Sequence, residues 1–301
     1  MLRYPHLNLK RILSQAKGKD GAFSFALLAW WSFLIALITG AFLAFYYRPW
    51  GDVFREVSYL TGVLPYGSFL RTLHYLSGQC FLIFILAHTL ESFWRGRYRG
   101  APPKAWAKLI LLLAVSFLLL FTGFILKGDK EGIHAASVMY YLAQEVPLIG
   151  TSVARLFLRP GEELFLLPYL YHVIILPLIV LFFLSQHRKR MLPRGDLGWP
   201  LLALLCCLAL VYRIPPDIPP HTELVTPTGP WFFQGVQLLL RYGPPLLVGV
   251  LWPLLPLGLM AALPLVPSPH IRWARLATAG SWGVHGMFIL LAWWLIPRLG
   301  S

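Results

Sequence analysis

Long apolar segments without Lys, Arg, Asp or Glu dominate this chain, and short polar stretches separate them. A helix that crosses the hydrocarbon core of a bilayer needs about 20 mostly apolar residues. Segments of suitable length occupy residues 24–47, 72–90, 109–126, 164–186, 242–269 and 276–297. A shorter apolar segment at 197–212 is a weaker candidate. The pattern predicts an all-α integral membrane protein with seven membrane-spanning helices.

Prolines interrupt the segment at residues 242–269. It contains Pro244, Pro245, Pro253, Pro256 and Pro264. Proline inside a helix removes a backbone hydrogen bond and clashes with the preceding turn. The sequence therefore predicts a kinked or broken helix in this segment.

Composition agrees with a membrane protein, and the distribution of charge predicts its orientation. The 301 residues are 57% hydrophobic and 13% charged, whereas soluble domains are about 25% charged. If the seven spans alternate, the loops on one side hold 16 of the 26 Lys and Arg and 3 of the 12 Asp and Glu. Basic residues accumulate on the cytoplasmic side. We therefore expect the N-terminus to face the cytoplasm and residue 301 to face outward. The net charge of +14 then needs no nucleic-acid partner.

Two sequence features bear on targeting and on covalent haem. Residues 1–20 are polar and basic and lack the apolar core and cleavage site of a secretory signal, so we expect the first span to be retained. The three cysteines, Cys80, Cys206 and Cys207, lie inside predicted spans. The chain contains no C-x-x-C-H motif for haem attachment and no zinc-ligand spacing. These cysteines are predicted to be small buried side chains.

Two predicted spans each carry a pair of histidines. His74 and His88 are 14 residues apart, and His172 and His187 are 15 apart. Fourteen residues of helix advance about 21 Å and return to within about 40° of the same face. The second interval overshoots by about 60°, which a bend at Pro177 would absorb. Any one of these histidines could simply bond to a neighbouring helix, but two matched pairs in lipid favour axial ligation of haem iron.

The histidines stand among motifs that resemble the cytochrome b of bc-type complexes, and more closely the short cytochrome b of plastoquinol-oxidising complexes. The resemblance implies that His74 and His172 bind an outer haem, and that His88 and His187 bind a cytoplasmic-side haem. The segments that carry it read "TGAFLAFYYRP" (39–49), "FTGFIL" (121–126), "VPLIG" (146–150) and "LRPG" (158–161).

The same resemblance implies three further haem contacts. Gly40 and Gly123 match glycines that lie against the outer haem, where a residue without a Cβ lets the backbone approach a flat macrocycle. Arg71 matches an arginine that meets a haem propionate, which is a sensible pairing of a basic group with a carboxylate. As a residue at the membrane interface, Arg71 could instead be a topology anchor.

The resemblance covers essentially the whole chain and implies an architecture. Residues 1–195 are expected to form a four-helix dihaem cytochrome b domain. Residues 196–301 are expected to form a three-helix C-terminal domain with a quinone site, similar to the separate small subunit of the plastoquinol enzymes. The implied cofactors are two b-type haems with bis-histidine iron, and quinone is the implied substrate. The implied setting is a homodimer within a larger complex of the bacterial inner membrane, with a c-type cytochrome and/or a Rieske-type iron–sulfur subunit.

The chain departs from the family pattern at the inner haem. Fourteen residues before Gly40 and Gly123, the family has a second pair of glycines, whereas this chain has Ala26 and Leu109. The inner haem is therefore expected to sit differently, or the helices to lie farther apart. Ser24 replaces the cysteine that attaches an extra haem in photosynthetic relatives, so no third haem is expected there.

The outer quinone site also departs from the pattern. The Pro-Glu-Trp-Tyr motif keeps Pro230, Trp231 and Phe232 but has no carboxylate, and "KGDKEG" (127–132) keeps only Asp129 and Gly132 of another family motif. We expect the outer site to bind quinone but to transfer protons by another route. No catalytic residue is assigned. The candidate proton carriers in outer loops are Asp129, His221, Glu223, Glu131 and His134. For each of these, a solvated loop residue is the alternative.

The sequence thus predicts a dihaem cytochrome b subunit of a membrane quinol/quinone oxidoreductase whose activity needs partner subunits. One alternative is a haem-bearing membrane anchor of a dehydrogenase or hydrogenase with a single quinone site. Another is a transporter or structural protein without haem, whose histidines bond only to neighbouring helices. His285, alone in the last span, is expected to form a hydrogen bond between helices rather than to contact quinone or haem. The sequence leaves open which quinone is used and which way electrons flow.

Overall fold

The structure is a computed structural model that describes residues 25–159, 161, 164–187, 197–223 and 227–299. Within these residues all regular structure is helical. Six helical segments are long and apolar enough to cross a bilayer. They correspond to the six longer segments predicted from the sequence. The prediction of an all-α membrane protein is confirmed.

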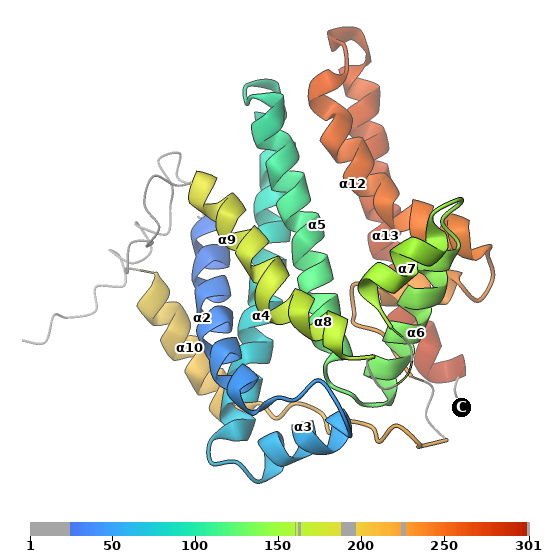
Figure 1. The fold of residues 1–301 in the computed structure, drawn as a ribbon. Helices are drawn as coiled ribbons and strands as arrows, with labels where there is room; N and C mark the ends of the chain where they lie inside the picture. Colours follow the sequence, from blue (N-terminus) through green and yellow to red (C-terminus); the bar gives the residue numbers. More distant parts are fainter. Residues whose placement is uncertain (1–24, 160, 162–163, 188–196, 224–226, 300–301) are drawn as a thin grey trace, which may run out of the picture.

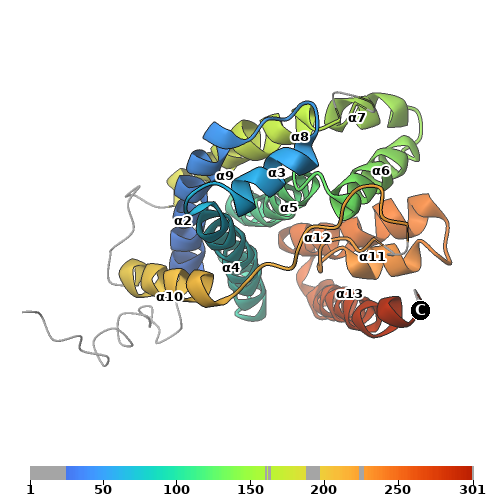
Figure 2. The same cartoon turned by 90° about the horizontal axis from the view of Figure 1, so that it is seen from below.

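Four segments form a bundle at the centre of the fold (Figures 1 and 2). The bundle consists of α2 (Phe25–Tyr46), α4 (Gly67–Trp94), α5 (Pro103–Ile125) and a fourth, interrupted segment. That fourth segment comprises α8 (Leu166–Leu170), a π-helical turn η2 (Tyr171–Ile175) and α9 (Leu176–His187). The core between these helices is built around Phe33, Phe81, Leu113 and Val180, which are almost fully buried.

Short helices cover the end of the bundle that the charge pattern predicts to be outer, which we call the outer end. They are α3 (Val53–Gly62), α6 (Lys130–Gln144) and α7 (Gly150–Phe157). Asp52 caps α3 by accepting a hydrogen bond from the backbone of Arg55. A short 3₁₀ turn, η1 (Arg97–Arg99), joins α4 to α5 at the opposite end.

The C-terminal helices are divided between two sides of the bundle (Figure 2). Helix α10 (Gly198–Val211) is the predicted weaker span, and it packs against α2 and α4. Helices α11 (Gln234–Leu239), α12 (Trp252–Ala262) and α13 (Ile271–Leu299) lie together on the other side, where α12 packs against α5. At 14 residues, α10 is about 21 Å long and shorter than a bilayer core. The predicted division at residue 195 lies outside the described residues.

The proline-rich segment is interrupted, as its sequence predicts. It begins with a π-helical turn, η3 (Leu246–Leu251), and continues as α12, which contains Pro256. Two 3₁₀ turns, η4 (Leu263–Leu265) and η5 (Ser268–His270), then connect it to α13. Proline has no backbone N–H, so the prolines in these turns cannot donate the hydrogen bonds that a continuous helix would need.

Candidate functional site

Two of the four predicted ligands lie face to edge in the core of the bundle. The imidazole of His74 on α4 and that of His172 in η2 have ring centroids 5.9 Å apart, with their planes 82° apart. A metal–imidazole nitrogen bond is about 2 Å long, so two imidazoles on one metal have centroids about 6 Å apart. The observed separation therefore suits one shared metal ion.

A haem would complete the coordination of a metal ion held by these two rings. Among the described residues, no group of three or more His, Cys, Asp or Glu side chains is placed to hold a metal ion. A bare ion between His74 and His172 would thus have two protein ligands only. Haem supplies four further nitrogen atoms, and histidine is a common axial ligand of its iron. The donor set at this position fits a bis-histidine haem.

A backbone carbonyl contacts Nδ1 of each imidazole and leaves its Nε2 atom available to a metal. Nδ1 of His74 lies 3.0 Å from the carbonyl oxygen of Ala36, and Nδ1 of His172 lies 2.9 Å from that of Leu119. Because a carbonyl only accepts, each Nδ1 carries the proton, and Nε2 is left with a lone pair for a metal. The hydroxyls of Thr39 and Thr122 lie next to the same Nδ1 atoms, at 3.3 and 3.5 Å.

Two glycines make room for these rings. A Cβ added at Gly40 would lie 2.8 Å from Cε1 of His74, and one at Gly123 would lie 2.5 Å from Cε1 of His172. Both distances are too short for a carbon–carbon contact. The arrangement of Ala36, Thr39 and Gly40 on α2 repeats as Leu119, Thr122 and Gly123 on α5. The two halves of the bundle therefore present equivalent cradles, one for each imidazole.

The second pair is described only in part. His88 is half-buried on α4, which continues without a break from His74. His187 is the last residue of α9, and its side chain lies outside the described residues. The 15-residue interval contains the π-helical turn η2, in which the N–H of Leu176 bonds to the carbonyl of Tyr171. A π turn accommodates one extra residue, so it compensates for the longer interval just before Pro177, where the sequence predicts a bend.

The motif predicted for the outer quinone site packs against α4 and α5. The indole N–H of Trp231 donates to the side-chain oxygen of Gln79 on α4, at 2.8 Å. The ring of Phe232 packs against Phe117 of α5, with centroids 5.3 Å apart. Pro230 is buried beside them. Gln79 is five residues from His74, so the motif lies next to the helix that carries an outer ligand.

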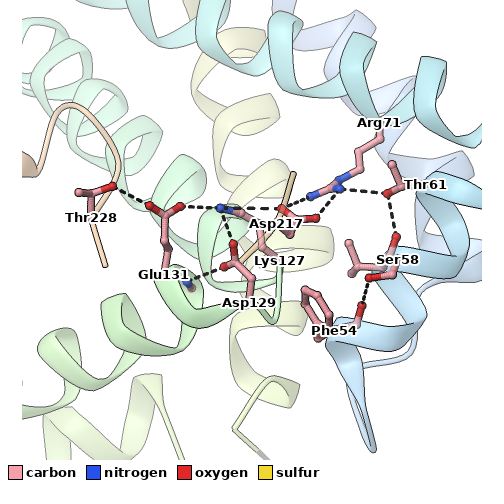
Figure 3. Close-up of polar contacts among 11 residues, drawn as sticks. Phe54, Ser58, Thr61, Arg71, Lys127, Asp129, Glu131, Asp217 and Thr228 are labelled. Atoms are coloured by element: carbon pink, nitrogen blue, oxygen red, sulfur yellow. Dashed lines mark hydrogen bonds and ion pairs between the residues drawn. The ribbon is translucent and has the colours of Figure 1, made fainter. Parts of the chain in front are cut away.

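A network of charged side chains links the outer ends of α4, α5 and α6 to the loop that precedes this motif (Figure 3). Arg71 pairs with Asp217 at 2.6 Å and donates to the hydroxyl of Thr61. The ammonium of Lys127 lies 2.8 Å from Asp129, 2.9 Å from Glu131 and 3.9 Å from Asp217. The hydroxyl of Thr228 donates to the other oxygen of Glu131, at 2.6 Å. We call Arg71, Lys127, Asp129, Glu131, Asp217 and Thr228 the outer network.

Opposite charges keep Lys127 protonated. Burial disfavours its charged form, but the carboxylates of Asp129 and Glu131 outweigh that effect and raise the pKa of Lys127. Arg71 was expected to meet a haem propionate, and the structure places its guanidinium against Asp217. Asp217, Thr228 and Gln79 were not singled out from the sequence. They lie far along the chain from their partners, and no local pattern indicates the pairing.

The candidate proton carriers occupy different environments. Asp129 is fully buried, caps α6 by accepting from the N–H of Gly132 at 2.8 Å, and belongs to the outer network with Glu131. His221 and Glu223 are exposed on the loop after α10 and lie outside this network. His134 is half-buried on α6, and burial together with the charge of Lys130 lowers its pKa. Of these candidates Glu131 bonds directly to the motif loop through Thr228, and Asp129 is joined to Glu131 through Lys127.

The buried pair of Arg71 and Asp217 should anchor the loop after α10. The side chains are 16% and 8% exposed, and removing one partner of a buried ion pair costs about 3 kcal/mol or more. We expect Asp217→Ala to lower the thermal unfolding temperature of the purified protein and to make residues 212–223 sensitive to protease. Glu91→Ala breaks the more exposed pair with Arg95 and should have little effect, about 0.5 kcal/mol. Equal effects of the two variants would contradict the anchoring role.

The sequence matches one protein family and is similar to individual proteins. Residues 17–192 match the model of the family described as cytochrome b/b6/petB. The chain is 31% identical over 160 residues to the cytochrome b6 of Heliobacterium modesticaldum, which covers 52% of this chain and 75% of that protein. It is 28% identical over 173 residues to the menaquinol:cytochrome c reductase cytochrome b subunit of Geobacillus thermodenitrificans, which covers 56% of this chain and 77% of that protein.

A solved structure extends the similarity of fold to the C-terminal helices. A chain of a hyperthermophilic respiratory Complex III matches with a TM-score of 0.67 and 19% identity. The match covers 96% of this chain and 94% of that one. At this level of identity the two chains share a fold.

Proposed function

Since this chain belongs to the cytochrome b/b6/petB family, we propose that it is the dihaem cytochrome b subunit of a membrane quinol/quinone oxidoreductase. The pair of His74 and His172 carries this proposal, because its spacing, its free Nε2 atoms and its glycine cradles all suit one haem. When bound, haem iron supplies reversible one-electron chemistry. The backbone carbonyls of Ala36 and Leu119 would orient the two imidazoles, while apolar side chains exclude water and the helices set the separation of the two sites.

The inner haem is proposed to bind between His88 and His187, about 21 Å along α4 from the outer one. Phe81 lies seven residues from both His74 and His88 and is almost fully buried. Its ring packs against Phe33 at 5.2 Å. This apolar layer would separate the two haems while leaving one continuous helix to position them. Ala26 and Leu109 occupy the inner level where the outer cradle has glycines, so we expect the inner haem to be held differently.

The outer quinone site is proposed to lie beside Trp231 and Phe232. Oxidation of a quinol releases protons, and a titratable group within reach of the hydroxyl has to accept them. The motif itself offers no carboxylate. Thr228, two residues before Pro230, connects the motif loop to Glu131. We propose that protons leave along Thr228 and Glu131 into the outer network. His221 and Glu223 would then serve only as surface residues.

The relatives suggest the partners. One is named as a subunit of menaquinol:cytochrome c reductase and the solved neighbour as part of Complex III. We propose that this chain likewise works with a c-type cytochrome and/or a Rieske-type iron–sulfur subunit. It would do so as a homodimer in a bacterial inner membrane, with its N-terminus in the cytoplasm. Subunits that copurify with the native protein would identify the electron acceptor.

An optical spectrum tests the proposal directly. The purified protein should show the reduced-minus-oxidised bands of b-type haem, with two haems per chain. Adding a quinol should reduce at least one of them. A colourless protein would refute the electron-carrying role, and one haem per chain would favour the membrane-anchor alternative.

Glu131→Gln tests the proton route. The substitution keeps the shape of the side chain and its contact with Thr228 but removes the proton acceptor. We expect reduction of the outer haem by quinol to slow about 100-fold or more, which is the lower end of what general base catalysis contributes. Reduction by dithionite should be unchanged.

Glu145, an exposed carboxylate at the opposite end of α6, provides the matched control. Glu145→Gln should leave the quinol reaction intact, and Glu131→Asp should recover part of the rate. An unchanged rate in Glu131→Gln would exclude this route for the proton.

A further inference from the structure

Three nitrogen-bearing rings gather where α12 packs against α13, two helices that lie together beside the bundle in Figure 1. The imidazole of His285 on α13 lies between two indoles, with its centroid 6.4 Å from that of Trp252 on α12 and 6.4 Å from that of Trp282. Phe288 packs edge-on against Trp252 at 5.9 Å. Trp282 also contacts the core on the α5 side, so this group faces the bundle.

The polar atoms of these rings are buried without hydrogen-bond partners among the described residues. They are Nε1 of Trp252, Nε1 of Trp282 and Nδ1 of His285. Trp106 donates to the carbonyl of Met260 at 2.7 Å and Trp231 donates to Gln79, whereas the lone indole of Trp30 in the bundle core also has no partner among the described residues. Buried polar groups nearly always have a partner. Three unsatisfied nitrogens in one group therefore call for an outside partner, and the predicted hydrogen bond between helices is absent at Nδ1 of His285.

The depth of the group restricts what that partner can be. His285 is 14 residues from each end of α13, or about 21 Å along the helix in either direction. The hydrocarbon core is about 30 Å thick, so this residue lies near its middle. Phospholipid head groups and bulk water do not reach that depth. The partner is therefore a lipid-soluble molecule with polar atoms.

The donor and acceptor pattern indicates a ring that bears oxygen atoms. The two indoles donate only, and an imidazole nitrogen can donate or accept. Pro256 has no N–H, so the carbonyl of Trp252 lacks its usual helical donor and is an additional acceptor. Quinone carbonyls accept from N–H groups, and quinol hydroxyls donate to a carbonyl or an imidazole. A flat head group also packs well against aromatic rings.

One side of α13 beside these rings is open. All three ring residues are half-buried. A Cβ at Gly283 or Gly286 would have no neighbour within 4 Å, so the backbone of α13 beside His285 is uncrowded. We propose that Trp252, Trp282 and His285 bind a quinone or quinol head group in the membrane interior, at a site separate from the Pro230–Phe232 motif. This inference rests on the proposed function only in assuming that quinone is the physiological substrate.

Photolabelling tests this site with the full-length protein in lipid nanodiscs. An azido-substituted short-chain quinone is added and illuminated, and the labelled peptides are mapped by mass spectrometry. We expect labelling within residues 246–262 and 276–290 that excess unlabelled quinone suppresses. In Trp252→Phe/Trp282→Phe, quinone binding there should weaken about tenfold or more, as expected for the loss of two hydrogen bonds. Trp293→Phe removes an indole from the lipid-exposed face of α13 and should change nothing.

Each outcome bears on one proposal. Absence of labelling in these helices, labelling that excess quinone does not suppress, or equal labelling of the double variant would overturn the membrane-interior site. Haem spectra of the variants check that they fold, and the wild-type map alone can refute the site if they do not. Labelling of residues 227–233 reports on the outer site independently. Its absence would count against the proposed function and leave this inference standing.

Discussion

Replacing His74 with leucine is expected to remove the outer haem and to leave the inner one in place, whereas His88→Leu should do the reverse. Each haem needs two axial nitrogens, and the two ligands on α4 lie about 21 Å apart along the helix, so neither can substitute for the other. Leucine keeps the helix and its apolar contacts. The haem-to-protein ratio should fall from two to one in each variant, with different absorption bands surviving.

The two variants serve as controls for each other. The motif proposed to bind quinol contacts α4 at Gln79, five residues from His74, so loss of the bands that respond to quinol should accompany His74→Leu. If both variants kept two haems, the assignment of ligands would be wrong. If each lost both haems while remaining folded, the two sites would depend on one another and the helix could not be treated as a rigid spacer.

Much of this site could be predicted from the sequence because the spacing of two residues along a helix fixes their relative depth and direction. The 14-residue interval between His74 and His88 needs only a continuous helix, and α4 provides one. The glycines were identified from the family resemblance as lying against the outer haem, and in the structure Gly40 and Gly123 each lie against the ring of a predicted ligand. The predicted kink in the proline-rich segment also needed no tertiary information, because proline changes the local backbone wherever it stands.

The contacts that depend on loops could not be predicted. Asp217 reaches Arg71 across 146 residues, and Trp231 reaches Gln79 across 152. No periodicity encodes such pairings. The sequence also predicted that a bend at Pro177 would absorb the 15-residue interval, and the structure places a π-helical turn just before that proline. The π-helical turn itself could not be predicted, because it depends on which carbonyl accepts each backbone N–H. The hydropathy pattern does not indicate those hydrogen-bond partners.

Helix α10 shows the same limit for whole elements. Its apolar residues mark it as a membrane helix and predict nothing about its neighbours. The structure packs it on α2 and α4, across the bundle from α12 and α13. The described segments 212–223 and 227–233 lie at the outer end between them, and the outer network holds both segments in place. The loop is thus part of the site, since it brings Asp217, Thr228 and the quinone motif to the bundle.

The glycine cradles give the second large prediction. Gly123→Ala is expected to abolish or strongly reduce binding of the outer haem, because the added Cβ would lie 2.5 Å from Cε1 of His172 and about 3 Å from both ring nitrogens. The ring cannot simply turn aside, since the carbonyl of Leu119 holds its Nδ1. Losing that hydrogen bond costs about 1 kcal/mol and an off-rotamer ring about another. Together they weaken haem binding about thirtyfold.

Gly40→Ala should have a smaller effect of the same kind, because its Cβ would lie 2.8 Å from Cε1 of His74 and farther from the ring nitrogens. Gly78→Ala is the matched control on α4, where a Cβ would meet nothing within 4 Å. Alanine is also favoured over glycine inside a helix by up to about 1 kcal/mol, so this variant should keep both haems. Haem content and the outer-haem bands measure all three. A ranking in which Gly78→Ala loses haem and Gly123→Ala does not would contradict the role of the cradles in making room for the ligand ring.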